Sequence, residues 1–273
     1  MASSNLIKIM ACFILMVSST ACGNMGFHRD SIGIIAHRGF WNCEEAGYAR
    51  NSIAALRCAQ DKHFWGSEFD VNMTSDSVLI VYHDSYIDDK RIEEYPYEEF
   101  KYVRLVNGEP IPTIDMYLEQ ARKHPQTMLV YELKPHSSTV VEDLFVELTI
   151  NKLKEYKMLK PSKVMFISFS YHICQRMAQL LPKFTVQYLG GDKEPEELVQ
   201  DGISGLDYNY GVLLSRSELV SQAAQLGLSV NTWTVNDIED MKRVVELKVS
   251  QVTSDFPLEL RSLLMAGKTR ELR

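Results

Sequence analysis

The sequence predicts an α/β fold, and within that class a (β/α)₈ barrel. From Ile32 onward, short β-rich segments alternate with helical patterns about eight times, and repeated βα units imply parallel strands joined by crossover helices. The length of 273 residues also matches such a barrel, which usually takes about 250 residues. An open doubly wound sheet is the structural competitor. It is disfavoured because His37-Arg38-Gly39, and not a glycine-rich dinucleotide motif, follows the first strand.

Composition and charge narrow the class of protein. With 45% hydrophobic and 24% charged residues, the chain has ordinary globular composition. The net charge of −7 leaves no basic footprint, so we expect no nucleic-acid partner. Five cysteines are too few for a disulfide scaffold. A Cys43–Cys58 pair is conceivable, and a buried free thiol at Cys58 fits its apolar helical pattern equally well.

The first residues form a predicted targeting segment. Lys8 is the only charged side chain before Cys22, and the apolar run from Ile9 to Val17 is nine residues long. A membrane-spanning helix needs about 20 apolar residues, whereas a run of nine suits the h-region of a secretory signal. The small residues 18–21, followed directly by Cys22, resemble the lipobox of bacterial lipoproteins. Ser19 departs from that pattern, in which leucine is favoured.

This resemblance sets the expected processing and domain organisation. It implies a signal peptide over residues 1–21 and a lipid-modified Cys22, with a plain secretory signal as the alternative. We then expect a tether over residues 22–31 and one barrel domain over residues 32–273. The protein would be held at the membrane of the cell envelope through its lipid, facing the periplasm.

The expected elements follow one another along the domain in barrel order. Strands are expected at Ile32–His37, Gly66–Asn72, Leu79–His83, Met128–Lys134, Val164–Ser168, Thr185–Leu189, Gly205–Tyr208, Val230–Val235 and Gln251–Ser254. Helices are expected at Ser52–His63, Ile114–His124, Val140–Tyr156, His172–Leu181, Pro195–Gln200, Ser217–Leu226, Asp237–Leu247 and Pro257–Ala266. A long polar stretch from Ser85 to Pro112 predicts a small insertion after His83.

Charged residues occur in strands that should be apolar. Barrel strands are buried on both faces, yet Glu68, Asp70 and Glu132 lie inside expected strands. Glu68 and Asp70 are two residues apart, so both point to one face of their strand. Three carboxylates meeting in one mouth repel one another, and a hard divalent cation removes that repulsion. Oxygen ligands favour Ca²⁺ or Mg²⁺ over zinc.

Two histidines and two cations accompany the acidic residues. His37 and His83 are expected at equivalent strand ends, and the C-terminal strand ends line the active site of a (β/α)₈ barrel. Phosphodiester cleavage needs a base for the attacking oxygen and an acid for the leaving alkoxide, and two imidazoles can serve both roles. Arg38 and Lys134 can hold the phosphate oxygens. Glu132 and Lys134 are also spaced to pair simply with each other.

With these motifs, the sequence resembles the glycerophosphodiester phosphodiesterase family. The matching segments occur in family order and cover almost all of the chain after residue 31: Ala36–Gly39, Asn51–Leu56, Gly66–Val71, His83-Asp84, Ile111–Ile114, Glu132–Lys134, Trp233–Asn236 and Thr253–Pro257. The family usually has Pro-Glu-Asn where this chain has Ala49-Arg50-Asn51.

The resemblance implies a reaction and a set of roles. It implies a (β/α)₈ barrel that hydrolyses glycerophosphodiesters, such as glycerophosphocholine or glycerophosphoethanolamine, to glycerol 3-phosphate and an alcohol. The residues then divide by role as follows: His37 and His83 are the acid–base pair, Glu68, Asp70 and Glu132 bind one cation, Arg38 and Lys134 contact phosphate, and Trp233 lies against the glycerol part. Two alternatives stay open: a phospholipase-type lyase that forms a cyclic phosphate, and a catalytically weak, lipid-anchored binding protein.

Overall fold

The structure is a computed structural model that describes residues 32–271. The expected signal peptide over residues 1–21 and the tether over residues 22–31 therefore lie outside the described residues, as does the lipid-modified Cys22. No helix among residues 32–271 is both long and apolar enough to cross a membrane.

Parallel strands form a ring, as the sequence predicts. Hydrogen-bonded neighbours follow the order β10-β9-β8-β7-β6-β2-β1-β11. The two ends of this path meet, because Ser250 N donates to Val230 O at 2.8 Å and Val235 N donates to Thr253 O at 3.0 Å. The competing open sheet is therefore wrong. The strands are β1 (Gly33–Ala36), β2 (Gly66–Met73), β6 (Met128–Leu133), β7 (Val164–Ser168), β8 (Val186–Tyr188), β9 (Gly205–Asn209), β10 (Ser229–Trp233) and β11 (Gln251–Ser254).

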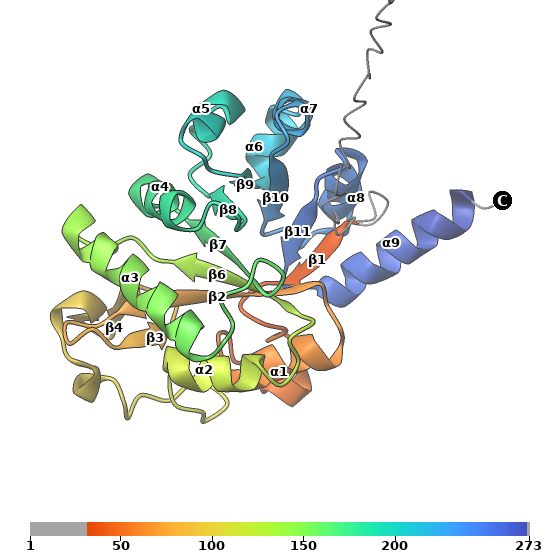
Figure 1. The fold of residues 1–273 in the computed structure, drawn as a ribbon. Helices are drawn as coiled ribbons and strands as arrows, with labels where there is room; N and C mark the ends of the chain where they lie inside the picture. The colour runs from red at the N-terminus through yellow and green to blue at the C-terminus, as the bar shows by residue number, and fades with distance from the viewer. Residues whose placement is uncertain (1–31, 272–273) are drawn as a thin grey trace, which may run out of the picture. The chain divides into compact units, whose positions relative to one another are not determined.

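Helices cover the outside of this ring (Figure 1). Most begin and end within three residues of the expected positions, because the sequence carries their caps. Ser52, Ser138 and Ser170, for example, each accept a hydrogen bond from a backbone N–H of the first turn. The helices are α1 (Ile53–Asp61), α2 (Ile114–Ala121), α3 (Thr139–Glu155), α4 (Tyr171–Leu180), α5 (Pro195–Gln200), α6 (Tyr210–Ser215), α7 (Glu218–Gln225), α8 (Ile238–Glu246) and α9 (Pro257–Glu271). Sequence patterning missed the six-residue helix α6.

The third expected strand is not part of the barrel. The segment β3 (Leu79–Val81) pairs antiparallel with the far end of β2, with Val71 opposite Val81. The expectation that His83 and His37 follow equivalent strands is therefore wrong. The reason is that β2 is eight residues long and its last residues extend past the barrel, where a turn sends the chain back along it. This return carries His83 to the mouth by a different route.

The insertion after His83 is confirmed as a small unit with its own core. It contains a two-stranded hairpin, β4 (Tyr86–Ile87) with β5 (Lys90–Arg91), followed by the short 3₁₀ helices η2 (Ile92–Glu94) and η3 (Tyr97–Glu99). Four of its apolar side chains form, together with Ile80 of β3, a cluster separate from the main core: Ile87, Ile92, Phe100 and Ile111.

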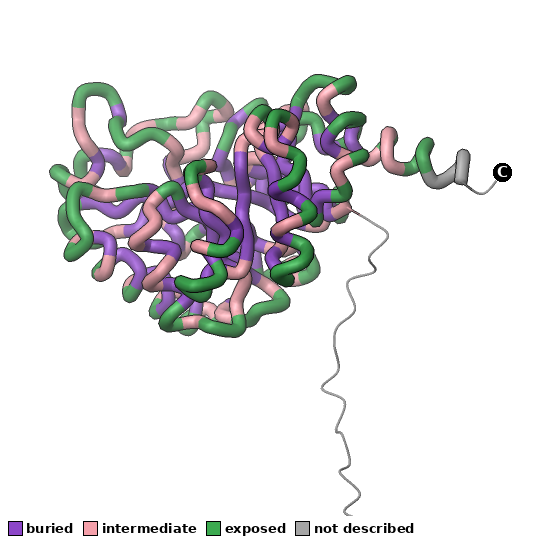
Figure 2. The backbone as a smooth tube through the Cα atoms, turned by 90° about the horizontal axis from the view of Figure 1, so that it is seen from above, coloured by how far each residue is buried: buried purple, intermediate pink, exposed green. Residues whose placement is uncertain are grey.

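Two apolar layers hold the barrel together. The larger lies between the strands and the surrounding helices, and the buried strands run through the centre of the molecule in Figure 2. The smaller fills the interior of the ring with Ile35, Val130, Met165, Ile167 and Leu189. Because this plug is apolar, the charged side chains are confined to the end of the barrel where the strands terminate.

The three cysteines of the described chain are free thiols. Cys58 is buried in α1 and its thiol is hydrogen-bonded with that of Cys43. The buried free thiol is therefore the arrangement in this structure.

Candidate active site at the mouth of the barrel

The structure brings the eight sequence-predicted site residues together at one end of the barrel. A pocket there is lined by seven of them, His37, Arg38, Glu68, Asp70, His83, Glu132 and Trp233. Lys134, the eighth, contacts two of the lining carboxylates. The other wall of the pocket is largely apolar, with Ile167, Phe169 and Leu189.

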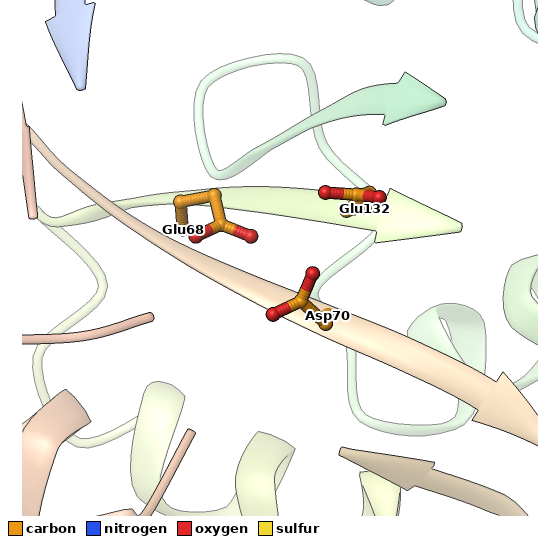
Figure 3. A group of neighbouring side chains, drawn as sticks. All are labelled: Glu68, Asp70 and Glu132. Carbon is orange, nitrogen blue, oxygen red and sulfur yellow. The ribbon is translucent and has the colours of Figure 1, made fainter. Parts of the chain in front are cut away.

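The acidic cluster comes from two neighbouring strands. Glu68 and Asp70 lie on β2, and Glu132 lies on β6, where the register pairs it with Asp70. One carboxylate oxygen from each of the three lies within 4.8 Å of the others (Figure 3). All three side chains are buried. Glu68 Oε1 is buried without a hydrogen-bond partner in the described structure.

Burial and mutual repulsion disturb these carboxyl groups. Burial, with Asp70 and Glu132 nearby, raises the pKa of Glu68 well above its ordinary value. Burial and Asp70 raise the pKa of Glu132 to about 7. For Asp70, burial also opposes ionisation, but Lys134, His83 and Arg38 outweigh it and lower the pKa to about 2. Ionisation of Glu68 and Glu132 therefore costs free energy, whereas Asp70 is stabilised as a carboxylate.

Two cationic side chains offset part of that charge. Lys134 Nζ donates to Glu132 Oε1 at 2.6 Å and to Asp70 Oδ1 at 3.2 Å. Arg38 Nε lies 3.5 Å from Asp70 Oδ2 but has no hydrogen-bond partner in the described part of the chain. The possibility that Glu132 and Lys134 pair with each other is therefore realised, and the pair lies inside the site.

The donor set fits a hard divalent cation. Three carboxylates against two cationic side chains leave a formal charge of −1 when all are ionised. The unpartnered Glu68 Oε1 supplies a free acceptor within the cluster. Oxygen-only ligands suit Ca²⁺ or Mg²⁺, and a divalent ion would turn the formal charge to +1. Glu68, Asp70 and Glu132 are therefore the residues that could hold such an ion.

The turn after β1 places His37 and Arg38. Arg38 and Gly39 both have left-handed backbone angles, with φ of 52° and 76°. A Cβ on Gly39 would lie 2.7 Å from the backbone of Ala55 in α1, so only glycine fits. The same turn directs Arg38 N toward Glu68 Oε2, to which it donates at 2.7 Å.

Asp255, which is not among the predicted site residues, belongs to the site. Its Oδ1 lies 2.8 Å from His37 Nδ1 and accepts from Trp41 Nε1 at 2.7 Å, while Oδ2 accepts from Asn236 Nδ2 at 2.8 Å. Burial opposes ionisation of Asp255, but His37 and the other two donors outweigh it and lower its pKa. With Nδ1 held in this way, His37 Nε2 faces the acidic cluster, 3.9 Å from Glu68 Oε2.

His83 has a different environment. Its Nδ1 lies 2.6 Å from Asp84 Oδ1, and both side chains are partly open to solvent. Burial lowers the pKa of His83, and Lys134 and Arg38 lower it further, while Asp70 acts in the opposite direction. The lowered pKa favours the neutral imidazole, which is the form that accepts a proton.

The segment 49–51, which departs from the family's usual Pro-Glu-Asn, still contacts residues of the site. Asn51 Nδ2 donates to Asp70 Oδ2 at 2.8 Å, and Asn51 Oδ1 accepts from Asp70 N at 3.2 Å. Arg50, where the family usually has glutamate, stacks over Trp41 at 4.3 Å from the ring centroid. It thus braces the residue that donates to Asp255.

Asp207 is a further site residue that sequence reasoning missed. It lines the pocket from β9, is 1% exposed and accepts from Asn231 Nδ2 at 2.9 Å through Oδ2. Its backbone oxygen accepts from Trp233 Nε1 at 2.8 Å. A signal was present in the sequence, because Asp207 is a charged residue inside an expected strand. Asp255, directly after an expected strand, carried a similar signal.

Fold and pocket together define a barrel enzyme with two histidines at its mouth and three buried carboxylates that could hold a metal ion. The model of the "Glycerophosphoryl diester phosphodiesterase family" matches residues 37–259, and the chain belongs to this family. Curated relatives named glycerophosphodiester phosphodiesterase agree. One from Caldanaerobacter subterraneus subsp. tengcongensis is 26% identical over 86% of this chain and 98% of its own. One from Bacillus subtilis is 28% identical over 92% and 95%.

Solved structures are similar over nearly the whole described domain. A glycerophosphodiester phosphodiesterase from Parabacteroides distasonis has a TM-score of 0.84 and 38% identity, covering 88% of this chain and 99% of its own. An Oleispira antarctica phosphodiesterase, solved with the product sn-glycerol-3-phosphate, has a TM-score of 0.72 at 24% identity, with 84% and 95% covered. At that identity the second likeness supports the fold alone.

Cation binding is expected to stabilise the folded protein through the acidic cluster. At a calcium concentration a hundredfold above Kd, the melting temperature of the wild type should rise by about 5 °C or more. In Glu68→Gln this shift should be lost, while the melting temperature in chelator stays equal or rises because a costly buried charge is gone.

Thermal melts with calcium and with chelator measure both effects. Glu147→Gln, which changes an exposed glutamate on α3, is the matched control and should keep the full shift. A calcium shift in Glu68→Gln as large as that of the wild type would exclude Glu68 as a ligand.

Proposed function

We propose that this chain hydrolyses glycerophosphodiesters to glycerol 3-phosphate and an alcohol, with one divalent cation held by Glu68, Asp70 and Glu132. The observation that carries the proposal is a pocket lined by three buried carboxylates, two histidines and Arg38, with Lys134 in contact with two of the carboxylates. Family membership supplies the reaction class. The identity of the ion, Ca²⁺ or Mg²⁺, is left to experiment.

The proposed roles of the histidines follow from their positions. His37 and His83 line the same pocket from different segments of the chain, so a phosphodiester between them would meet an imidazole on each side. One imidazole accepts the proton of the attacking oxygen, and the other donates a proton to the leaving alkoxide. Asp255 and Asp84 each hold an Nδ1, which leaves the two Nε2 atoms for proton transfer.

Phosphate binding is assigned to Arg38 and Lys134. A phosphodiester carries one negative charge, so the acidic cluster with Arg38 and Lys134 would repel it without the cation, whereas the same group of side chains with the cation bound would have the complementary sign. When bound, the cation offsets the charge of the phosphate oxygens and of the developing alkoxide. The unpartnered Arg38 Nε and the third N–H of the Lys134 ammonium, which donates to Glu132 and Asp70 through the other two, can then bind phosphate oxygens.

Product release tests the reaction directly. With glycerophosphocholine or glycerophosphoethanolamine and calcium or magnesium, the enzyme should release glycerol 3-phosphate, and chelator should abolish the release. Phosphorus NMR of the first product distinguishes hydrolysis from cyclisation, because a cyclic phosphate has its own resonance. Undiminished turnover in chelator would contradict the cation site, and a cyclic first product would favour the lyase alternative.

The histidines and Asp255 should affect the rate to different extents. His37→Ala or His83→Ala should lower kcat by about 10²–10⁴-fold. Asp255→Asn should lower kcat by about 10²-fold, at the lower end of that range, because His37 loses its anchor and its nearby negative charge.

The balance between kcat and KM separates positioning from simple loss of stability. In Asp255→Asn kcat should fall while KM and the melting temperature change little, because a neutral amide holds Nδ1 of His37 less firmly than a carboxylate does. Asp143→Asn is the matched control, since Asp143 also pairs with a histidine, His172, at 2.9 Å, but outside the pocket. Near-normal kcat in His37→Ala or His83→Ala would reject the acid–base assignment.

We also propose that the protein is anchored to the cell-envelope membrane by a lipid on Cys22. The short apolar run and the small residues before Cys22 support this proposal. A periplasm-facing enzyme would meet phosphodiesters released from lipid headgroups.

Lipid labelling tests the anchor. The wild type should incorporate labelled fatty acid and fractionate with membranes, and globomycin should cause the precursor to accumulate. Cys22→Ser should lose the label. A released, unlabelled wild-type protein would support the plain secretory signal.

A further inference from the structure

We propose that Asp207 binds a hydroxyl group of the glycerol moiety and thereby selects glycerophosphodiesters over phosphodiesters of simple alcohols. This inference rests on the proposed function and assigns a residue to its substrate selectivity. Asp207 lines the pocket, yet it is not part of the three-carboxylate group that could hold the cation.

One oxygen of Asp207 is held and the other is left without a partner. Oδ2 accepts from Asn231 Nδ2 at 2.9 Å, and Asn231 Nδ2 is in turn 3.3 Å from Thr253 Oγ1. These contacts fix the orientation of the carboxyl group. Oδ1 is buried and has no hydrogen-bond partner among the residues that the structure describes. A buried polar atom without a partner is costly, so a ligand that supplies one gains affinity.

The surroundings of Asp207 favour a small polyol. Trp233 Nε1 donates to the backbone oxygen of Asp207 at 2.8 Å, and the Trp233 ring packs edge-to-face against Phe169. With Ile167 and Leu189, these rings form the apolar wall of the pocket. Carbon atoms of glycerol can lie against this wall while one hydroxyl reaches Oδ1.

A hydroxyl suits this position better than a phosphate oxygen or a quaternary ammonium does. A phosphate oxygen is an acceptor and would be repelled by a carboxylate. A quaternary ammonium, as in choline, has no hydrogen to donate. A hydroxyl both donates and accepts, so it can pair with Oδ1 whether or not Asp207 carries a proton.

Binding of product-like probes tests the assignment on the full-length protein in detergent, with calcium present. Calorimetry compares sn-glycerol 3-phosphate with propyl phosphate, which has the same carbon chain but lacks both hydroxyls. The wild type should bind glycerol 3-phosphate about tenfold more tightly. In Asp207→Leu the ratio should fall to near 1, and in Asp207→Asn, which keeps hydrogen-bonding groups, most of the preference should return.

Two controls make the outcome specific. Gln187→Leu removes another buried side chain whose oxygen has no partner but which is not among the pocket-lining residues, and it should keep the wild-type ratio. Inorganic phosphate should bind Asp207→Leu with measurable affinity, which shows that the variant has folded with an intact phosphate subsite.

The results separate this inference from the proposed reaction. An unchanged ratio in Asp207→Leu, or no preference in the wild type, overturns the inference even if turnover is normal. Ethanolamine phosphate is a further probe. If Asp207→Leu binds it less tightly than the wild type but binds sn-glycerol 3-phosphate equally well, the inference is also overturned, because Asp207 would then contact an ammonium group. A preference that is lost in Asp207→Leu, in an enzyme that releases no glycerol 3-phosphate, would uphold the subsite and reject the reaction.

Discussion

Repulsion among three buried carboxylates is the constraint on which the rest of the site depends. Glu68, Asp70 and Glu132 are held within a few ångströms of one another, and their side chains are almost fully buried. Such a cluster is stable only if opposite charge lies beside it. Lys134 and Arg38 supply part of that charge, and the remainder is what a divalent cation would supply. In the proposed function, the same deficit is the reason that an anionic substrate would bind after the ion.

The barrel meets this constraint by assembling the site from distant segments of the chain. The parallel register of β2 and β6 puts Asp70 beside Glu132, and the turn after β1 brings Arg38 N to Glu68. Asp255, after β11, then fixes His37 from the other side. Because these contacts come from the ends of different strands, closure of the barrel gives the site its geometry. The apolar side chains that fill the barrel interior keep the charged side chains at the mouth.

The sequence predicts much of this arrangement because its patterns are local. Period-2 spacing on one strand placed Glu68 and Asp70 on a common face, and serine caps located several helices. The position of His83 depended instead on how far β2 extends beyond the barrel, which no local pattern encodes. Asp255 and Asp207 were missed for a related reason, since one resembles a helix cap and the other is a single charge in a strand. Their roles become visible only with their partners, His37 and Asn231, in place.

The two histidines illustrate how environment separates similar groups. His37 lies between two carboxylates, with Asp255 at its Nδ1 and Glu68 near its Nε2. His83 is partly exposed beside Asp84 and near the two cationic side chains Arg38 and Lys134. Such unequal surroundings favour a division of acid and base roles.

A crystal structure of the protein grown with Ca²⁺, with Mn²⁺ substituted to give an anomalous signal, tests the central claim most directly. The account predicts one ion with oxygens from Glu68, Asp70 and Glu132 at about 2.3–2.6 Å for calcium. An ion bound elsewhere, or no anomalous peak between β2 and β6 at saturating metal, would contradict it.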